Sequence, residues 1–456
     1  MREYLQIPNA DDIRGNITLP DEIGGVHVTW KSSNPAVISD TDANDGLLKK
    51  GVVTRSPKED VEVMLTAIPD AIPDAIPDAT PDGPCEPYEF KVTVKKAPEP
   101  LKDEDFAGYL FAHFIGEENE DGEQIYFSLS TDGLHFHDMN DLKPVLKSKV
   151  GECGVRDPYI CRSKEGDRFF LIATDLSIYH RGGWHLNAQG YYDPSTTGSS
   201  NLVFWESKDL IHFSEPRLLP VAPKNAGMAW APEMVYDETT GSYVIFFSSS
   251  IMNPETKMKA KPNTIFYVTT RDFVRFSETK ILLDCQTDGM EGGRPREIID
   301  TTILKVGDTY YAASKDGDNA EKNGGIRIHC TKTPLDPESW EKVLDLDELG
   351  LSVEKLDIPV LDNSQLEGPE LFVYNRCDWA DPNVPEYGLM MDRFMAGSGY
   401  LPLKTTDLTD AKNERGSWKI LDSSEYSFDR LKKRHGTILN ITQKEIEQWG
   451  RGFLTH

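Results

Sequence analysis

The sequence has few cysteines, a shortage of basic residues and no long apolar run, and each shortage excludes a class of protein. Its six cysteines form no C-x-x-C pair, so neither a zinc site nor a disulfide framework is indicated. Lys and Arg number 49 against 76 Asp and Glu, a formal charge of −27 that disfavours nucleic acid and anionic membrane partners. No stretch reaches the ~18 apolar residues of a membrane span. A neutral, polyhydroxylated ligand is compatible with this charge.

The opening residues, MREYLQIPNADDIRG, contain no apolar core of the kind that a signal peptide has. The sequence as written therefore predicts a cytoplasmic protein, or a secreted one if a leader has been lost. The oligomeric state is left open by the sequence.

Residues 1–97 alternate short β-rich runs with turns, which predicts a small antiparallel β-sandwich domain. The runs are NITLP, VHVTWKSSN, GVVTR, VEVMLTAI and YEFKVTVKK. Among them, AIPDAIPDAIPDATPDGP places a proline at nearly every fourth position, which removes backbone donors and predicts a protruding loop. Residues 98–104 are proline-bearing and charged, as is typical of a linker.

A repeat runs through residues 105–456. One unit consists of a polar motif, a strand, an acidic or glycine turn and an aromatic strand; its copies are DPYICRSKEGDRFFLIAT, APEMVYDETTGSYVIFFSS, DTTILKVGDTYYAAS, EGPELFVYN and HGTILNIT. One residue marks each copy, and the five markers are Asp157, Pro232, Asp300, Glu367 and His435, spaced by 75, 68, 67 and 68 residues. Such regular spacing indicates a repeat architecture.

A second unit, a strand with a Ser/Thr-bearing turn and a closing aromatic, follows each of the first four copies. Its fifth copy, QIYFSLSTDGLHF, instead precedes them all, so the final blade begins with HGTILNIT and is completed by residues 107–146. Five four-stranded sheets, closed by pairing distant parts of the chain, predict a five-bladed β-propeller. A large β-sandwich would explain the strands but not the equal intervals.

Three carboxylates stand at the starts of predicted first strands: Asp157, Asp300 and Glu367. First strands line the channel of a propeller, so these side chains are expected to share one pocket. Like charges at close range raise one another's pKa. Glycoside hydrolysis uses such a pair, one carboxyl protonated and one ionised, ~6.5–9.5 Å apart when the enzyme inverts configuration. Taken singly, each acid could equally be a turn or strand-capping residue.

The motifs RDPYI, WAPEMVYD, IDTTI, EGPEL and KKRHGTI resemble, in this order, glycoside hydrolase family 43 over about residues 105–450. The resemblance implies a five-bladed propeller and an inverting enzyme acting on arabinose- or xylose-containing glycans. It implies that Asp157 is the general base, that Asp300 tunes the pKa of the acid and orients it, and that Glu367 is the general acid. Thr301 departs from the family, which more often has Pro after the middle Asp.

The predicted substrate-binding residues are Trp230, Arg393 and His435. Trp230 is expected to stack on the sugar, and the resemblance implies that Arg393 bonds sugar hydroxyls and that His435 lies in the channel. Their structural alternatives are a core indole, a salt-bridged surface arginine and a satisfied histidine. No cofactor is expected to be required; a structural calcium ion near His435 is left open, although no Asp-rich loop accompanies it. Glu233 also opens a blade, but the resemblance gives it no catalytic role.

Residues 1–97, with VTWKSSNPAVI and GVVTR, resemble the bacterial immunoglobulin-like modules that accompany such enzymes as spacers or packing partners. The function expected from these patterns is an inverting exo-glycosidase that removes terminal α-L-arabinofuranosyl residues from plant-type poly- or oligosaccharides. β-Xylosidase and exo-galactosidase are alternatives on the same scaffold. A non-catalytic glycan-binding propeller is an alternative of another class, and the joint presence of three acids argues against it.

Overall fold

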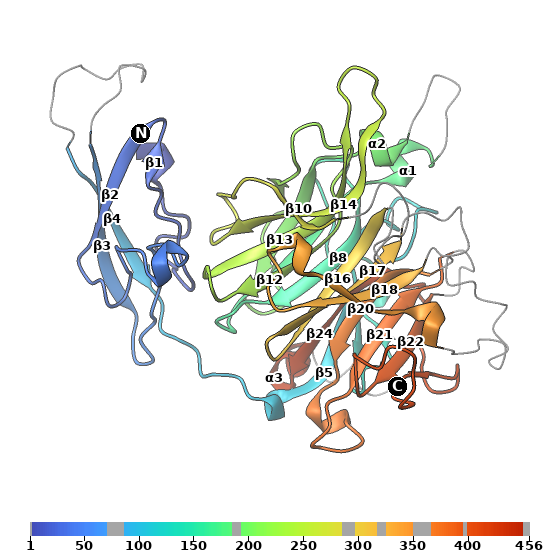
Figure 1. Cartoon of the computed structure of the whole chain (residues 1–456). Helices are drawn as coiled ribbons and strands as arrows, with labels where there is room; N and C mark the ends of the chain where they lie inside the picture. Colours follow the sequence, from blue (N-terminus) through green and yellow to red (C-terminus); the bar gives the residue numbers. More distant parts are fainter. Residues whose placement is uncertain are drawn as a thin grey trace.

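The computed structural model describes residues 2–70, 86–184, 193–284, 297–316, 325–349, 366–394 and 399–449. Within these ranges the chain forms six four-stranded sheets and the short helices α1 (Ile178–Arg181), α2 (Pro194–Thr197) and α3 (Gln443–Gln448). The predicted all-β fold class is confirmed (Figure 1). None of the helices in the described ranges is long and apolar enough to cross a bilayer.

The N-terminal sheet has the order β1 (Glu22–Ile23), β2 (Val26–Ser32), β3 (Val61–Pro69) and β4 (Tyr88–Val94), and every pair is antiparallel. Residues along β2 alternate strictly between buried and exposed, because one face of the sheet covers a core and the other faces water. The sheet lies apart from the other strands in Figure 1, at the blue end of the colour scale.

Two of the predicted N-terminal strands are wrong. NITLP and GVVTR form no strand, and Val53 makes only an isolated bridge with Ile38. Apolar loop residues, among them Ile13, Ile17 and Ile38, fill the core beside the sheet instead. The described N-terminal residues therefore form one sheet with packed loops rather than two sheets, and the immunoglobulin-like assignment stays a prediction. Residues 71–84, most of the proline repeat, lie outside the described residues.

The other five sheets each have four antiparallel strands that follow one another outward from an innermost strand. They are β8 (Val155–Arg162), β9 (Phe169–Asp175), β10 (Asn201–Ser207) and β11 (Arg217–Pro220); β12 (Trp230–Asp237), β13 (Ser242–Met252), β14 (Lys259–Thr270) and β15 (Lys280–Leu283); β16 (Ile298–Val306), β17 (Thr309–Asp316), β18 (Ile326–Thr331) and β19 (Glu341–Asp345); β20 (Glu367–Val373), β21 (Tyr387–Asp392), β22 (Tyr400–Thr405) and β23 (Lys419–Ile420); and β24 (Arg434–Thr442), β5 (Phe106–Phe114), β6 (Tyr126–Ser130) and β7 (His137–Asp138).

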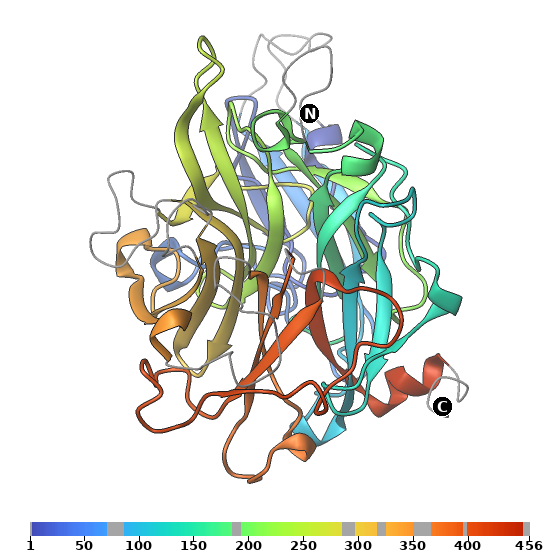
Figure 2. The ribbon, with the colours of Figure 1, turned by 90° about the vertical axis from the view of Figure 1, so that its right-hand side faces the viewer.

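The innermost strands form a closed ring, in which β8 contacts β12, β12 contacts β16, β16 contacts β20, β20 contacts β24 and β24 contacts β8. Figure 2 looks onto the propeller with its sheets arranged around a centre and the N-terminal sheet behind them. The predicted five blades are confirmed by this ring.

The fifth blade joins two distant parts of the chain, as the displaced repeat predicts. β24 pairs antiparallel with β5, from Arg434 opposite Phe114 to Thr442 opposite Phe106. The two strands lie side by side near α3 in Figure 1. Closure of this kind leaves only the short outermost strand of each blade as an edge.

Each innermost strand is bulged near its start. The pairing register shifts between Arg156 and Tyr159 in β8 and at the corresponding places in β12, β16, β20 and β24. Four of the bulged residues have positive φ: Asp157 (49°), Ala231 (45°), Asp300 (50°) and Gly368 (51°). Bulges redirect side chains, and Asp and Gly tolerate this backbone region better than most residues. His435 occupies the same place in β24, so the sequence markers Pro232 and Glu367 were each one residue out of register.

Two residues beyond each bulge, a polar side chain bonds to the innermost strand of the next blade. The five bonds join Tyr159 Oη to Met234 O (2.8 Å), Ile303 N to Glu233 Oε2 (3.3 Å), Leu371 N to Thr302 Oγ1 (3.5 Å), Ile438 N to Glu370 Oε1 (2.9 Å) and Thr437 Oγ1 to Pro158 O (2.9 Å). Together they tie the ring of blades. Glu233 and Glu370 therefore have a structural use in the channel.

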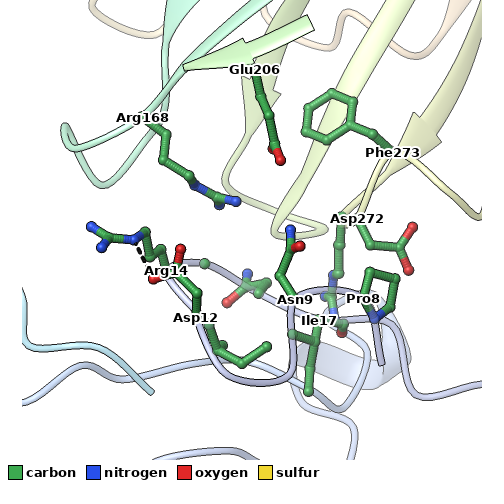
Figure 3. A pocket seen from close by; sticks show the side chains of 13 residues that line it. Pro8, Asn9, Asp12, Arg14, Ile17, Arg168, Glu206, Asp272 and Phe273 are labelled. Atoms are coloured by element: carbon green, nitrogen blue, oxygen red, sulfur yellow. Dashed lines mark hydrogen bonds and ion pairs between the residues drawn. The ribbon is translucent and has the colours of Figure 1, made fainter. Parts of the chain in front are cut away.

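Loops of the N-terminal region, rather than its sheet, contact the propeller at the far end of β8 from Asp157. Asp167, in the β8–β9 turn, accepts hydrogen bonds from Arg14 Nη1 and Arg55 Nη2, both at 2.7 Å. Arg271 donates to the backbone oxygen of Lys50 at 2.8 Å. A cavity of about 30 Å³ remains at this contact (Figure 3). It has room for about one water molecule and is too small for a sugar.

Candidate active site

Two of the predicted catalytic carboxylates meet at one imidazole. His435 Nδ1 lies 3.4 Å from Asp157 Oδ1 and 3.8 Å from Asp300 Oδ2. The three residues are bulged positions of β24, β8 and β16, which is why side chains so distant in sequence converge. Their side chains retain only 10%, 16% and 12% of their exposure, so the group sits in a largely buried hollow.

Glu367 lies beside this group at the start of β20. Its Oε1 accepts a 2.8 Å bond from Arg434 Nη2, and the N–H of the next residue, Gly368, donates to Asp300 Oδ2 at 3.2 Å. A Cβ atom on Gly368 would lie 2.6 Å from Cγ of His435, and the positive φ there also disfavours other residues. The glycine of the EGP motif therefore allows the histidine to approach. The structure thus brings Asp157, Asp300 and Glu367 together.

The acids around His435 favour the positively charged form of its imidazole. Burial by itself lowers the pKa of the imidazole, but Asp300, Asp157 and Glu233 raise that pKa to about 10. Burial works to raise the pKa of Asp157; the hydrogen bond and charge of His435, with the nearby charge of Arg156, outweigh it and hold this pKa below its usual value. Asp157 is therefore ionised at neutral pH.

Glu367 has the opposite tendency. Burial, followed by the negative charges of Asp300 and Asp392, raises the pKa of Glu367 to about 7 against the lowering influence of Arg434. Burial also raises the pKa of Asp300, and the Asp157 charge adds to this. One carboxyl that is ionised and one that holds its proton near neutral pH make an acid–base pair.

Thr174 and Arg434 support the carboxylates, and the sequence analysis missed both. Thr174 Oγ1, on β9, donates to Asp157 Oδ2 at 2.8 Å and accepts from Ala231 N at 2.8 Å. Arg434 bonds Glu367 and the fully buried Asp392. Arg434 stands beside His435 in the KKRHGTI motif and could have been found there, whereas nothing in the sequence marks Thr174.

Trp230 belongs to the wall near the site. It is partly buried, and its ring lies 6.4 Å from that of Trp184 in an edge-to-face arrangement. Trp184 Nε1 donates to Glu117 Oε1 at 2.9 Å, which holds the second indole in place. Nε1 of Trp230 is buried and has no hydrogen-bond partner among the described residues. The partly exposed ring face, rather than this enclosed N–H, is the part of Trp230 that can contact a sugar.

Arg393 lies in the connection between β21 and β22 and is not a surface residue. Only 8% of it is exposed, and its Nε and Nη2 donate to the backbone oxygens of Gly399 (2.9 Å) and Tyr400 (3.0 Å). The salt-bridged surface arginine is therefore excluded as an alternative. Its contact with sugar hydroxyls stays a prediction.

The structural calcium ion that the sequence leaves open near His435 stays a prediction. The described part of the chain contains no group of three or more His, Cys, Asp or Glu side chains arranged to hold a metal ion.

Comparison with known proteins identifies one family and one curated relative. The model of a probable glycosyl hydrolase domain, related to glycoside hydrolase family 43, matches residues 104–447. An α-L-arabinofuranosidase of Bifidobacterium longum subsp. longum is 27% identical over 99% of this chain and 44% of its own length. The chain thus spans less than half of that relative.

Solved structures with a similar outline include a thermostable family-43 glycoside hydrolase. It has a TM-score of 0.43 and 13% identity, with 72% of this chain and 92% of that chain covered. The family-93 α-L-arabinofuranosidase of Fusarium graminearum, solved with arabinobiose, also has a TM-score of 0.43, at 14% identity and with 76% and 88% covered.

Proposed function

Since the chain belongs to the family of probable glycosyl hydrolase domains related to glycoside hydrolase family 43, we propose that it is an inverting exo-glycosidase that releases terminal α-L-arabinofuranosyl residues from plant-type poly- or oligosaccharides. The choice of sugar is supported by the arabinofuranosidase relative. The observation that carries the catalytic assignment is the convergence of Asp157, Asp300 and Glu367 beside His435. The lowered pKa of Asp157 and the pKa of Glu367, raised to about 7, support it.

In the proposed reaction, ionised Asp157 takes a proton from a water molecule while the oxygen of this water attacks the anomeric carbon. Protonated Glu367 gives its proton to the glycosidic oxygen as the bond between this oxygen and the anomeric carbon breaks. The products are a free sugar of inverted configuration and the shortened glycan. Asp157 ends protonated and Glu367 ionised, and exchange with solvent restores both.

The other residues of the site orient this pair. Thr174 fixes one oxygen of Asp157, and Arg434 fixes one oxygen of Glu367. Asp300 adds negative charge that keeps Glu367 protonated. Trp230 offers an indole face to the sugar. A glycan-binding propeller would have no use for carboxyls held in opposite protonation states.

The substrate assignment is tested by measuring hydrolysis of 4-nitrophenyl α-L-arabinofuranoside, β-D-xyloside and β-D-galactoside side by side. We expect the arabinofuranoside to be cleaved fastest and proton NMR to show the inverted anomer as the first product. Faster cleavage of the xyloside or galactoside would replace the proposed sugar. If all three stay intact while arabinan still binds, the protein is a lectin; a retained anomer would rule out single displacement.

Asp300→Asn is expected to move the alkaline limb of the pH profile to lower pH by about one unit, because it removes a negative charge that raises the pKa of Glu367. The general acid works when protonated, so activity falls as pH rises through this pKa, about 7 in the parent. kcat/KM against pH measures the shift. Asp308→Asn, an exposed aspartate in the turn of the same blade, is the matched control. A limb that stays in place, or moves upward, would contradict the role given to Asp300.

A further inference from the structure

A second pocket, of about 440 Å³, opens at the opposite end of the innermost strands from the candidate active site. Its lining includes Phe106, Lys305, Arg376, Trp379, Tyr387 and Asn440. These residues come from the end of β16, the connection between β20 and β21, the start of β21, the end of β24 and the start of β5. Glu367 begins β20, a strand of seven residues, so roughly 20 Å separate the two sites. The pocket is therefore distinct from the catalytic hollow.

Aromatic side chains supply much of the pocket wall, and at least one of them is held in place. Trp379 Nε1 donates to the backbone oxygen of Tyr374 at 2.8 Å, which fixes the indole while leaving it partly exposed. Phe106 and Tyr387 add further ring surface. Fixed aromatic faces of this kind pack well against the C–H faces of sugar rings, and they lose little conformational entropy on binding.

Polar groups surround these rings. Asn440 Nδ2 donates to Asn375 Oδ1 at 2.7 Å and to Val373 O at 3.0 Å, which orients both amides. The side chain of Arg376 is 44% exposed and lies 3.7 Å from Glu104, too far for a hydrogen bond, so its N–H groups can reach a ligand. A pocket with aromatic walls and a few oriented polar groups is typical of small-ligand sites, which span ~300–1,000 Å³.

The charges around the pocket favour a neutral ligand. Exposed Lys305 and Arg376 are balanced by exposed Asp103 and by Glu104 beside them. The formal charge of −27 on the whole chain works against phosphate-bearing or other polyanionic ligands. The hydroxyl groups of a neutral sugar can donate hydrogen bonds to the carboxylates and accept them from the lysine and the arginine, so they suit this mixed set of charged side chains.

We infer that this pocket is a second glycan site, which binds an internal stretch of the same neutral polysaccharide whose termini the active site removes. The inference rests on the proposed function for the choice of glycan. A long polymer can occupy both ends of the propeller, and binding at one end raises its effective concentration at the other. A small aryl glycoside fills only the catalytic hollow, so the second site affects polymers alone.

The test compares Trp379→Ala with Tyr4→Ala, which removes an aromatic side chain that is 68% exposed outside the pocket. Affinity electrophoresis in debranched arabinan, with every variant in a Glu367→Gln background that prevents cleavage, measures polymer binding. We expect Trp379→Ala to bind about tenfold more weakly and Tyr4→Ala to bind like the parent. In the active background, both should turn over 4-nitrophenyl α-L-arabinofuranoside at the parental rate.

Arg376→Ala should also weaken polymer binding. Because Arg376 is exposed, its loss leaves the packing around Trp379 unchanged, so this variant tests the site independently. Parental affinity in both Trp379→Ala and Arg376→Ala would overturn the second site, as would equal losses on polymer and aryl glycoside in Arg376→Ala. If the parent cleaves no aryl glycoside but these variants still lose polymer binding, the proposed function fails while the glycan site stands.

Discussion

Asp157→Asn is expected to lower kcat on 4-nitrophenyl α-L-arabinofuranoside on the order of 10³-fold, equivalent to about 4 kcal/mol of activation free energy. The amide keeps the shape of the side chain and can still bond Thr174 Oγ1, but it cannot take a proton from water. Because the attacking water must lose a proton whatever group departs, the loss should be similar for good and poor leaving groups. Steady-state kinetics on both kinds of substrate measures it.

Asp167→Asn is the matched control for this change. Asp167 lies on the same β8–β9 hairpin, at its other end, where it binds Arg14 and Arg55 of the N-terminal region. Turnover of the aryl glycoside should therefore be unchanged in Asp167→Asn. An Asp157→Asn variant that retains more than a tenth of the parental kcat would show that another group acts as the base.

Glu367→Gln is expected to abolish most activity on arabino-oligosaccharides, on the order of 10³-fold, because their alkoxide leaving groups need a proton. 2,4-Dinitrophenolate departs without one, so the same variant should retain much of its activity on the dinitrophenyl arabinofuranoside. The alkaline limb near pH 7 should also disappear, since it reports the titration of Glu367. The ratio of kcat/KM values on the two substrates measures the effect.

Glu370→Gln provides a closely matched control on the same strand. Burial raises the pKa of Glu370 to about 8, so this carboxyl is largely neutral at pH 7 and an amide replaces it without a change of charge. It accepts a bond from Ile438 N, which the glutamine oxygen can still accept. Near-parental activity is expected. Equal losses of Glu367→Gln on good and poor leaving groups would contradict its assignment as proton donor.

The propeller could be predicted from sequence because its repeat is a matter of spacing. Equal intervals between similar motifs predicted the number of blades, and the displaced copy QIYFSLSTDGLHF predicted the pairing of β24 with β5. The N-terminal region offered no such repeat. Local β propensity alone then predicted strands at NITLP and GVVTR, which instead form loops whose apolar residues pack against a neighbouring sheet.

The candidate site was predictable only in its most distinctive members. Acids at strand starts could be recognised, but a bulge leaves no clear mark in the sequence. The sequence therefore aligned Asp157 with Pro232 and Glu367, each one residue away from the true equivalents, Ala231 and Gly368. The direction of Glu233 depends on the same bulge: it bonds Ile303 of the next blade, which a one-dimensional pattern cannot show. Thr174 acts from a second strand and needs the folded sheet to be recognised.

The origin of the positive charges has a consequence for how the protein is made. His435 and Arg434, which offset the acids of the hollow, both belong to β24, the strand that leaves the ribosome after every other strand described in the propeller. A nascent chain that has emerged only as far as β23 carries Asp157, Asp300 and Glu367 without either cation. Arg156 of β8 still offsets Asp157, but Asp300 and Glu367 lack the charges of His435 and Arg434, so their pKa values stay raised. The proposed acid–base pair is therefore complete only when β24 docks beside β5 and brings both cations into the hollow.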